Sequence, residues 1–113
     1  MNKTIISGFL GADPIIKILA NELKVARFDV AVSKKHKDRS GELVEKTTWF
    51  RVEAWGKLAD VTEKILRKSD HVLVEGEFEV EKWKDSEGNP KIKYVINPVL
   101  IEKLTKKQDV ESV

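Results

Sequence analysis

Five stretches of the 113-residue chain have the alternation or the β-branched composition of strands, and a single stretch between the third and the fourth has helical spacing. The predicted strands are residues 4–10, 24–33, 46–56, 71–83 and 91–101. Between residues 57 and 68, apolar side chains recur with the period of an amphipathic helix, at Leu58, Val61, Ile65 and Leu66. The sequence therefore predicts an all-β domain that contains one α-helix.

The order of these elements predicts a small closed barrel. One helix between the third and the fourth of five strands is the layout of the oligonucleotide/oligosaccharide-binding (OB) fold. Residues 15–20 are expected to extend the first strand after a bend or bulge, and residues 34–45 to form a mobile hairpin loop. Pro98 cannot donate a ladder hydrogen bond, so the last strand is expected to lie at an edge or to contain a bulge there.

Composition excludes several classes of function. The chain has no cysteine, so disulfides and thiolate metal sites are impossible. The two histidines have no metal-ligand spacing, no phosphate-cradling glycine loop occurs and no catalytic constellation is visible, so we expect no metal, no cofactor and no enzyme. No apolar stretch is long enough to span a membrane, and a cytoplasmic location is expected. The net charge of only +2 does not by itself indicate a nucleic-acid partner.

All three tryptophans fall on the polar faces of predicted strands. Alternation places Trp49 and Trp55 beside Arg51 and Glu53, and it places Trp83 beside a row of glutamates. The opposite faces are apolar and comprise Phe50, Val52 and Ala54 in one strand and Val72, Val74, Phe78 and Val80 in the other. Indoles in such positions could be covered by a loop or by a second subunit. Nucleobases, which stack on exposed rings, are the favoured alternative.

Several segments, in their order and spacing, resemble the bacterial-type single-stranded DNA-binding proteins over residues 2–104. The matching segments are Asn2-Lys3, Gly8, Leu10-Gly11, Asp13-Pro14, Thr48-Trp49-Phe50-Arg51-Val52, Trp55-Gly56-Lys57-Leu58-Ala59, Leu66-Arg67-Lys68, Val74-Glu75-Gly76 and Lys82-Trp83. The resemblance implies an OB-fold DNA-binding domain over residues 1–104, a short polar tail over residues 105–113, and a homotetramer. It implies a role in coating and protecting single-stranded DNA during replication, recombination and repair, close to the nucleoid.

The resemblance also assigns candidate site residues. It implies base stacking on Trp49, Trp55 and Trp83, with His36 at a fourth position where the family often has tryptophan. It implies phosphate contacts from Arg51, Lys57, Lys68 and Lys82. The basic run beside His36 adds three further candidates for phosphate binding, which are Lys34, Lys35 and Lys37.

Two departures from the family keep other functions open. Glu77, Glu79 and Glu81 stand where relatives are often neutral or basic, and they would repel phosphates near Trp83. The tail 106–113 lacks the acidic tip that recruits replication and repair proteins in the family. A replication-restart primosome-type OB protein that acts mainly through protein contacts is therefore an alternative, and an RNA- or tRNA-binding barrel is a third.

Overall fold

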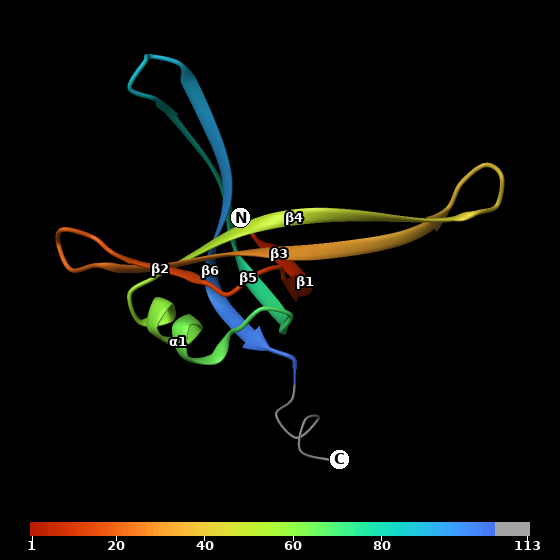
Figure 1. The fold of residues 1–113 in the computed structure, drawn as a ribbon, viewed down its shortest axis with the longest axis horizontal. Coiled ribbons are helices and arrows are strands. Elements are labelled where there is room, and N and C mark those ends of the chain that lie inside the picture. Colours follow the sequence, from red (N-terminus) through yellow and green to blue (C-terminus); the bar gives the residue numbers. More distant parts are fainter. Residues whose placement is uncertain (106–113) are drawn as a thin grey trace.

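The computed structural model describes residues 1–105 and consists of six strands and one helix (Figure 1). In chain order the elements are β1 (Thr4–Leu10), β2 (Ile15–Ile18), β3 (Lys24–Lys37), β4 (Leu43–Trp55), α1 (Lys57–Ile65), β5 (His71–Lys84) and β6 (Pro90–Lys103). All five predicted strands and the predicted helix are present, so the expected element order is confirmed.

Five of the six strands close into a barrel. The sheet order is β1-β5-β6-β4-β3-β2, and an additional pairing of β1 with β3 joins the two ends of the five-stranded part. Neighbouring strands are antiparallel except β4 and β6, which run parallel and share the pair Val52↔Ile96. The helix lies between the third and the fourth barrel strands in sequence, as the OB layout predicts.

The barrel interior is filled by the apolar phase of each strand. Phe28, Val30, Val52 and Val74 are all at most 4% exposed, and Leu66, which directly follows α1, belongs to the same buried cluster. The helix contributes Ala59 and Thr62 to the interior. It ends at Ile65 rather than at residue 68, because Leu66 is already extended, with φ −101° and ψ 137°. Val61, which the helical spacing assigned to the apolar stripe, is 41% exposed.

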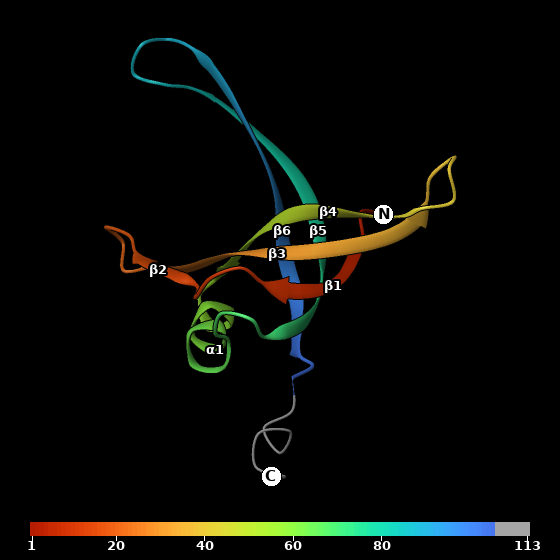
Figure 2. The same ribbon diagram turned by 45° about the vertical axis from the view of Figure 1, so that its right-hand side comes forward.

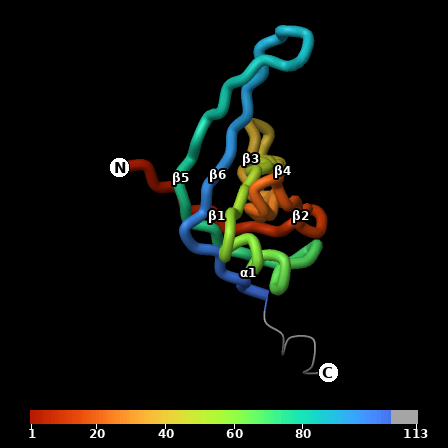
Figure 3. Tube along the Cα trace, turned by 90° about the vertical axis from the view of Figure 1, so that its left-hand side faces the viewer, coloured from red at the N-terminus to blue at the C-terminus, as the bar shows by residue number. Residues whose placement is uncertain are grey.

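Two long hairpins leave the barrel as separate arms. The β3–β4 hairpin extends to one side and the β5–β6 hairpin extends upward, and the two diverge (Figures 1 and 2). The radius of gyration is 16.7 Å, whereas a compact domain of this length has about 13 Å. Viewed from the side, the β5–β6 arm again stands clear of the rest of the chain (Figure 3). The prediction of a mobile loop over residues 34–45 is wrong, since only residues 38–42 lie outside the paired strands.

Both arms end in the same kind of turn. In the β3–β4 arm, a carboxylate oxygen of Asp38 accepts hydrogen bonds from the backbone amides of Ser40 and Glu42, at 2.9 and 3.0 Å. In the β5–β6 arm, Asp85 accepts from the amides of Glu87 and Asn89, both at 2.9 Å. Each turn contains a glycine with positive φ, 86° at residue 41 and 83° at residue 88. The conformation of each tip is therefore fixed by hydrogen bonds within the turn, without packing against the barrel.

Two further details differ from or refine the expectations. Residues 15–18 do not extend β1 but form a strand of their own, which pairs with β3 through Ile16↔Ala26. The expected irregularity at Pro98 is a bulge, because the β5–β6 register passes from Glu75↔Leu100 to Gly76↔Pro98. The strand that carries Pro98 lies between β5 and β4 and is not at a sheet edge.

Candidate nucleic-acid interface

Two tryptophans lie on the outer face of β4, as alternation predicts. Trp49 is 58% exposed and Trp55 is 41% exposed, whereas Val52 and Ala54 on the inner face are fully buried. Arg51 lies between the indoles and is partly exposed. Glu53 is the exception on this face. It is only 5% exposed, so its prediction as a solvent-facing charge is wrong. An ionised carboxylate at such a position requires a partner, and Lys93 provides it.

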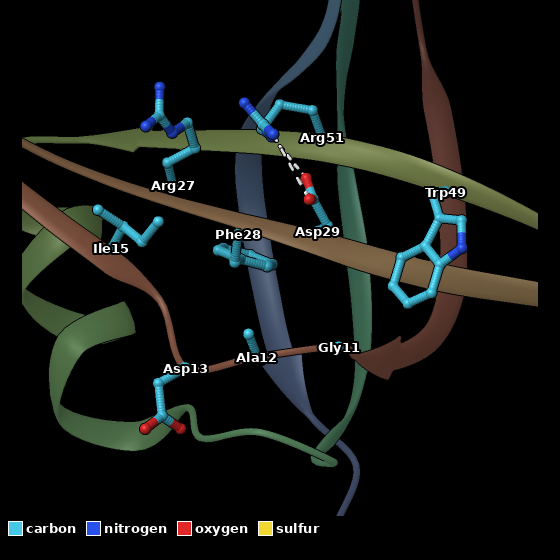
Figure 4. Close-up of a pocket in the computed structure, with 9 residues that line it drawn as sticks. All are labelled: Gly11, Ala12, Asp13, Ile15, Arg27, Phe28, Asp29, Trp49 and Arg51. Atoms are coloured by element: carbon cyan, nitrogen blue, oxygen red, sulfur yellow. Dashed lines mark hydrogen bonds and ion pairs between the residues drawn. The ribbon is translucent and has the colours of Figure 1, made fainter.

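Trp49 borders a pocket between β3, β4 and the end of β1 (Figure 4). Its ring lies directly over Gly11, where an added Cβ would come within 2.6 Å of the indole. Any residue larger than glycine would displace the ring, so the absence of a side chain at Gly11 allows the indole of Trp49 to occupy this position. The segment that follows β1 and the side chains of Arg27 and Asp29 complete the wall. An aromatic face and two guanidinium groups, those of Arg27 and Arg51, thus share one recess.

Arg51 is paired across the strands with Asp29. Its Nε donates to Oδ1 at 2.5 Å, and a second nitrogen lies 3.5 Å from Oδ2. This hydrogen bond raises the pKa of Arg51 above its ordinary value. Both side chains remain substantially exposed, at 37% and 44%, so the pair contributes little to stability. The guanidinium is held in place but can still meet a phosphate from solvent.

Trp55 shares a second recess with an ion-pair network. Lys93 reaches across from β6 and donates to Glu53 at 2.9 Å, and it also lies 3.2 Å from Glu81 on β5. The hydrogen bond to Glu53 is the largest of the effects that raise the pKa of Lys93. Arg27 lines the same recess from the β3 side. Positive charge is therefore exposed on the β2–β3 side of Trp55, while carboxylates dominate the β5–β6 side.

Trp83 lies near the tip of the β5–β6 arm. It is 48% exposed and borders a shallow apolar groove together with Pro90 and Ile92. Alternation along β5 keeps it in phase with Glu79 and Glu81. The β5 side of the ladder has no bulge between those residues and Trp83, so the predicted shared face is retained.

The predicted basic residues are spread over four regions. Lys34, Lys35, His36 and Lys37 form the outer part of the β3–β4 arm and are exposed. His36 pairs with Val44, while Trp49 pairs with Ala31 five positions back along β3, so about 16 Å separate them. His36 also has the alternation phase of the core residues of β3, and therefore lies on the face opposite to that of Asp29. The structure thus does not bring His36 together with the three tryptophans.

The remaining basic candidates lie near the helix and on the second arm. Lys57 is the first residue of α1, and Lys68 follows the helix with its backbone amide bonded to Asp13 at 2.7 Å. Lys82 is exposed, but alternation points it away from the face of Trp83. Of the predicted phosphate-binding residues, Arg51 alone lies directly between two of the tryptophans.

The apolar face predicted for β5 is buried only inside the barrel. Val72 and Val74 are completely buried, but Phe78 is 37% exposed and Val80 is 45% exposed. These two positions lie past Gly76, where the hairpin has left the barrel, so they do not reach the barrel interior. Phe78 instead stacks on Tyr94 of β6, with ring centroids 6.0 Å apart.

Two site residues were missed by the sequence reasoning. Arg27 could have been predicted from the sequence, because it shares the polar face of its strand with Asp29. The contact of Lys93 could not have been predicted, because its partner Glu53 lies 40 residues away in the chain. Within residues 1–105, no group of three His, Cys, Asp or Glu side chains could hold a metal ion. No helix in this described part of the chain is long and apolar enough to cross a membrane.

Comparisons with known proteins agree with this geometry. The curated "Single-stranded DNA-binding protein 1" of Chlorobaculum tepidum is 40% identical over 91 residues, which are 80% of this chain and 56% of that protein. The chain thus spans little more than half the length of this relative. A Plasmodium falciparum SSB solved in complex with ssDNA superposes with a TM-score of 0.85 and 32% identity, over 93% of this chain and 96% of the other.

A more distant structure shares the fold. A deletion mutant of the single-stranded DNA binding protein from Thermus aquaticus superposes with a TM-score of 0.82 at 24% identity, over 96% of this chain and 52% of that one. The model of the single-strand binding protein family matches residues 1–104. A match that covers nearly the whole chain, together with the OB barrel and the relative at 40% identity, shows that this protein belongs to the single-strand binding protein family.

Proposed function

We propose that this protein binds single-stranded DNA without sequence preference, and that it coats and protects the strand during replication, recombination and repair. The observation that carries the proposal is the outer face of β4, where two half-exposed indoles flank an arginine. Any base can stack on an indole, whereas a duplex hides the faces of its bases. One relative is a single-stranded DNA-binding protein and another was solved in complex with ssDNA, which supports the same ligand for this protein.

The proposed roles of the individual residues in base stacking and phosphate binding follow from their exposure and charge. Bases stack on Trp49, Trp55 and Trp83, and Arg51 binds a phosphate between the first two. Lys57, Lys68 and Lys82, together with the arm residues Lys34, Lys35 and Lys37, attract more distant parts of the backbone. His36 is proposed as a weaker stacking residue at the edge of the footprint, because it lies away from the tryptophans. Arg27 joins this set because it borders both recesses.

The proposal includes assembly into a homotetramer. On the outer side of β1, Ile5 and Phe9 are 56% and 53% exposed, and Leu100 on β6 is 44% exposed. A row of apolar side chains on an outer sheet face supports contact with further copies of this chain. Several subunits on one strand would raise the avidity by effective concentration. In this reading the protein works where DNA is unwound, in the cytoplasm beside the nucleoid.

The test is intrinsic tryptophan fluorescence during titration with oligo-dT. We expect quenching by single strands, weakened at high salt because bound phosphates release counterions. Duplex DNA of the same length should quench little, and oligo-U tests the RNA-binding alternative. If no nucleic acid changes the fluorescence, the indoles do not meet bases. The primosome-type alternative, which acts through protein contacts, would then take the place of this proposal.

A further inference from the structure

We infer that Lys93 is a positioning residue that fixes the β5–β6 arm, and with it Trp83, relative to Trp55. For the DNA-binding consequence this rests on the proposed function, but the placement of the arm does not. The inference starts from the ion-pair network between Glu53 on β4, Lys93 on β6 and Glu81 on β5. These three side chains join the wall of the barrel to the base of the arm.

The network is buried at one end and exposed at the other. The side chain of Glu53 is 7% exposed, that of Lys93 is 29% exposed and that of Glu81 is 45% exposed. The ammonium lies 2.9 Å from Glu53 and 3.2 Å from Glu81, within reach of both carboxylates at once. The inner pair joins β6 of the arm to β4 of the barrel and is shielded from salt, whereas the outer pair joins the two strands of the arm to each other. Because Lys93 belongs to the arm, its bond to the buried Glu53 ties the arm to the barrel.

The positions of the carboxylates relate the network to the tryptophans. Glu53 lies two residues before Trp55, and Glu81 lies two residues before Trp83. Side chains two positions apart on a strand share a face, so each carboxylate is the same-face neighbour of an indole. Lys93 thus links the two strand segments that present Trp55 and Trp83. A change in this link alters the spacing between the two stacking surfaces.

Few backbone contacts fix the arm on this side. The parallel ladder between β4 and β6 contains the single pair Val52↔Ile96, and beyond it the two hairpins diverge. On the opposite side, the side chain of Asn2 bonds to the backbone of Phe78 in both directions, at 2.8 and 3.1 Å. Next to the backbone ladder, the side-chain contacts at the base of the arm are therefore the two hydrogen bonds of Asn2 on one side and the bond from Lys93 to Glu53 on the other. Lys93 is the contact on the side of Trp55.

Charge separates this role from that of a phosphate-binding lysine. Two carboxylates surround one ammonium, so the network carries a net charge of −1 when all three groups are ionised. A phosphate that approaches Lys93 meets this negative surplus. Lys91, two positions earlier on the same strand face, is 52% exposed and has a distant partner, Asp85, at 3.9 Å. Lys91 has the same charge without the link, which makes it a matched control.

The first experiment measures the placement of the arm without DNA. The chain has no cysteine, so spin labels can be attached to cysteines introduced at Ser86, on the arm tip, and at Lys64, on the outside of α1. Refolding with excess unlabelled protein leaves at most one labelled subunit in each assembly. We expect a narrow distribution of the label–label distance in the parent protein and in Lys91→Met. In Lys93→Met the distribution should be at least twice as broad.

A second variant guards against misfolding. Lys93→Met leaves Glu53 buried without a counterion and can destabilise the barrel. Glu53→Gln combined with Lys93→Met removes both charges of the link and leaves no ion buried. It should also broaden the distance distribution, while Lys93→Arg should keep it narrow. Glu81→Gln breaks only the contact within the arm and should leave the distribution narrow. An unchanged distribution in folded Lys93→Met and in the folded double variant would overturn the inference, whether or not the protein binds DNA.

The second experiment tests the consequence for binding. Lys93→Met should weaken binding of oligo-dT at least threefold, with no change in the salt slope, because no phosphate contact is lost. In a Trp83→Ala background the same change should have no further effect, since the arm then has no indole to place. A threefold loss that is unchanged in that background, with a shallower salt slope, would make Lys93 a phosphate ligand and overturn the positioning role. If the parent binds no DNA, the proposed function fails, while the distance measurements still decide the role of the link.

Discussion

The change Trp49→Ala removes the most exposed of the three indoles. A fully accessible tryptophan has roughly 250 Å² of surface, so 58% exposure leaves about 145 Å² available to a ligand. A base stacked on one face covers roughly half of this, about 70 Å², which at about 25 cal/mol per Å² is about 1.8 kcal/mol. We therefore expect the dissociation constant for oligo-dT to rise about 20-fold, since about 1.4 kcal/mol corresponds to a factor of ten.

The fold should survive this change. The buried 42% of Trp49 is about 105 Å², and its loss costs at most about 2.6 kcal/mol. A domain with about 5–15 kcal/mol of stability remains folded after such a loss. Circular dichroism melting and sedimentation check folding and assembly before affinity is measured. A variant that unfolds at room temperature would show that the indole belongs to the core and would refute its assignment to the binding face.

Ile18→Ala is the control for Trp49→Ala. Ile18 ends β2, is 68% exposed and lines neither of the two recesses that contain Trp49 and Trp55. Tyr94, although 56% exposed, is unsuitable because it lines a recess together with Trp49 and Arg51. We expect Ile18→Ala to change the affinity less than twofold. If it weakens binding as strongly as Trp49→Ala, exposed apolar area alone sets the affinity, and the assignment of a distinct binding face would be wrong.

Four further outcomes are expected. Asp29→Asn releases Arg51 from its partner and should tighten oligo-dT binding by at most about fivefold, because an exposed ion pair contributes up to about 1 kcal/mol. An unchanged affinity would show that Arg51 does not contact a phosphate. Glu79→Gln removes a repelling charge from the face of Trp83 and should tighten binding more at low than at high salt; equal affinity at low salt would place the DNA elsewhere. Gly8→Ala would place a Cβ 2.1 Å from the carbonyl oxygen of Ala31, so it should lower the free energy of unfolding by about 1–3 kcal/mol or more. Denaturant titration measures this loss, and Ser7→Ala, the control, should leave the free energy of unfolding nearly unchanged. Finally, hydrogen bonds lower the pKa of both turn carboxyls below the ordinary 3.8. The largest effect comes from the Ser40 side chain at Asp38 and from the Asn89 backbone amide at Asp85. Their stabilisation is thus complete above the unfolded value and lost as the pH falls through the folded one. The amides of Glu42 and Asn89 donate to these carboxylates, so their protection from exchange, relative to the unfolded chain at the same pH, should fall below about pH 4. Protection that stays constant down to about pH 2 would contradict this.

Most of the barrel could be predicted because its strands carry local information. The alternation of Phe28 and Val30 with charged neighbours identifies a half-buried strand without knowledge of its partners. The same alternation placed Trp49 and Trp55 on the outer face, and both are substantially exposed. The family resemblance was carried by these segments, and the matching family model covers residues 1–104.

The errors concern residues whose environment depends on distant parts of the chain. Glu53 has the alternation phase of a solvent-facing charge, but Lys93, from a strand 40 residues later, covers and neutralises it. Phe78 and Val80 have the phase of core residues, but the barrel ends below them. Residues 34–37 are polar on both faces, as loops commonly are, yet their backbone pairs with residues 43–46. The expectation about an acidic tip falls on residues 106–113, outside the described part of the chain.

The two aspartate-capped turns have a consequence for the energetics of binding. Because each turn is closed by its own side chain, both arms are already shaped before any ligand arrives. A ligand that lies along them need not supply the ordering entropy of a disordered loop, which costs about 1–2 kcal/mol for each residue fixed. Binding should then lack the large negative heat-capacity change that accompanies coupled folding. The heat-capacity change on binding, measured by calorimetry, should therefore be that of two preformed surfaces in contact rather than that of folding coupled to binding.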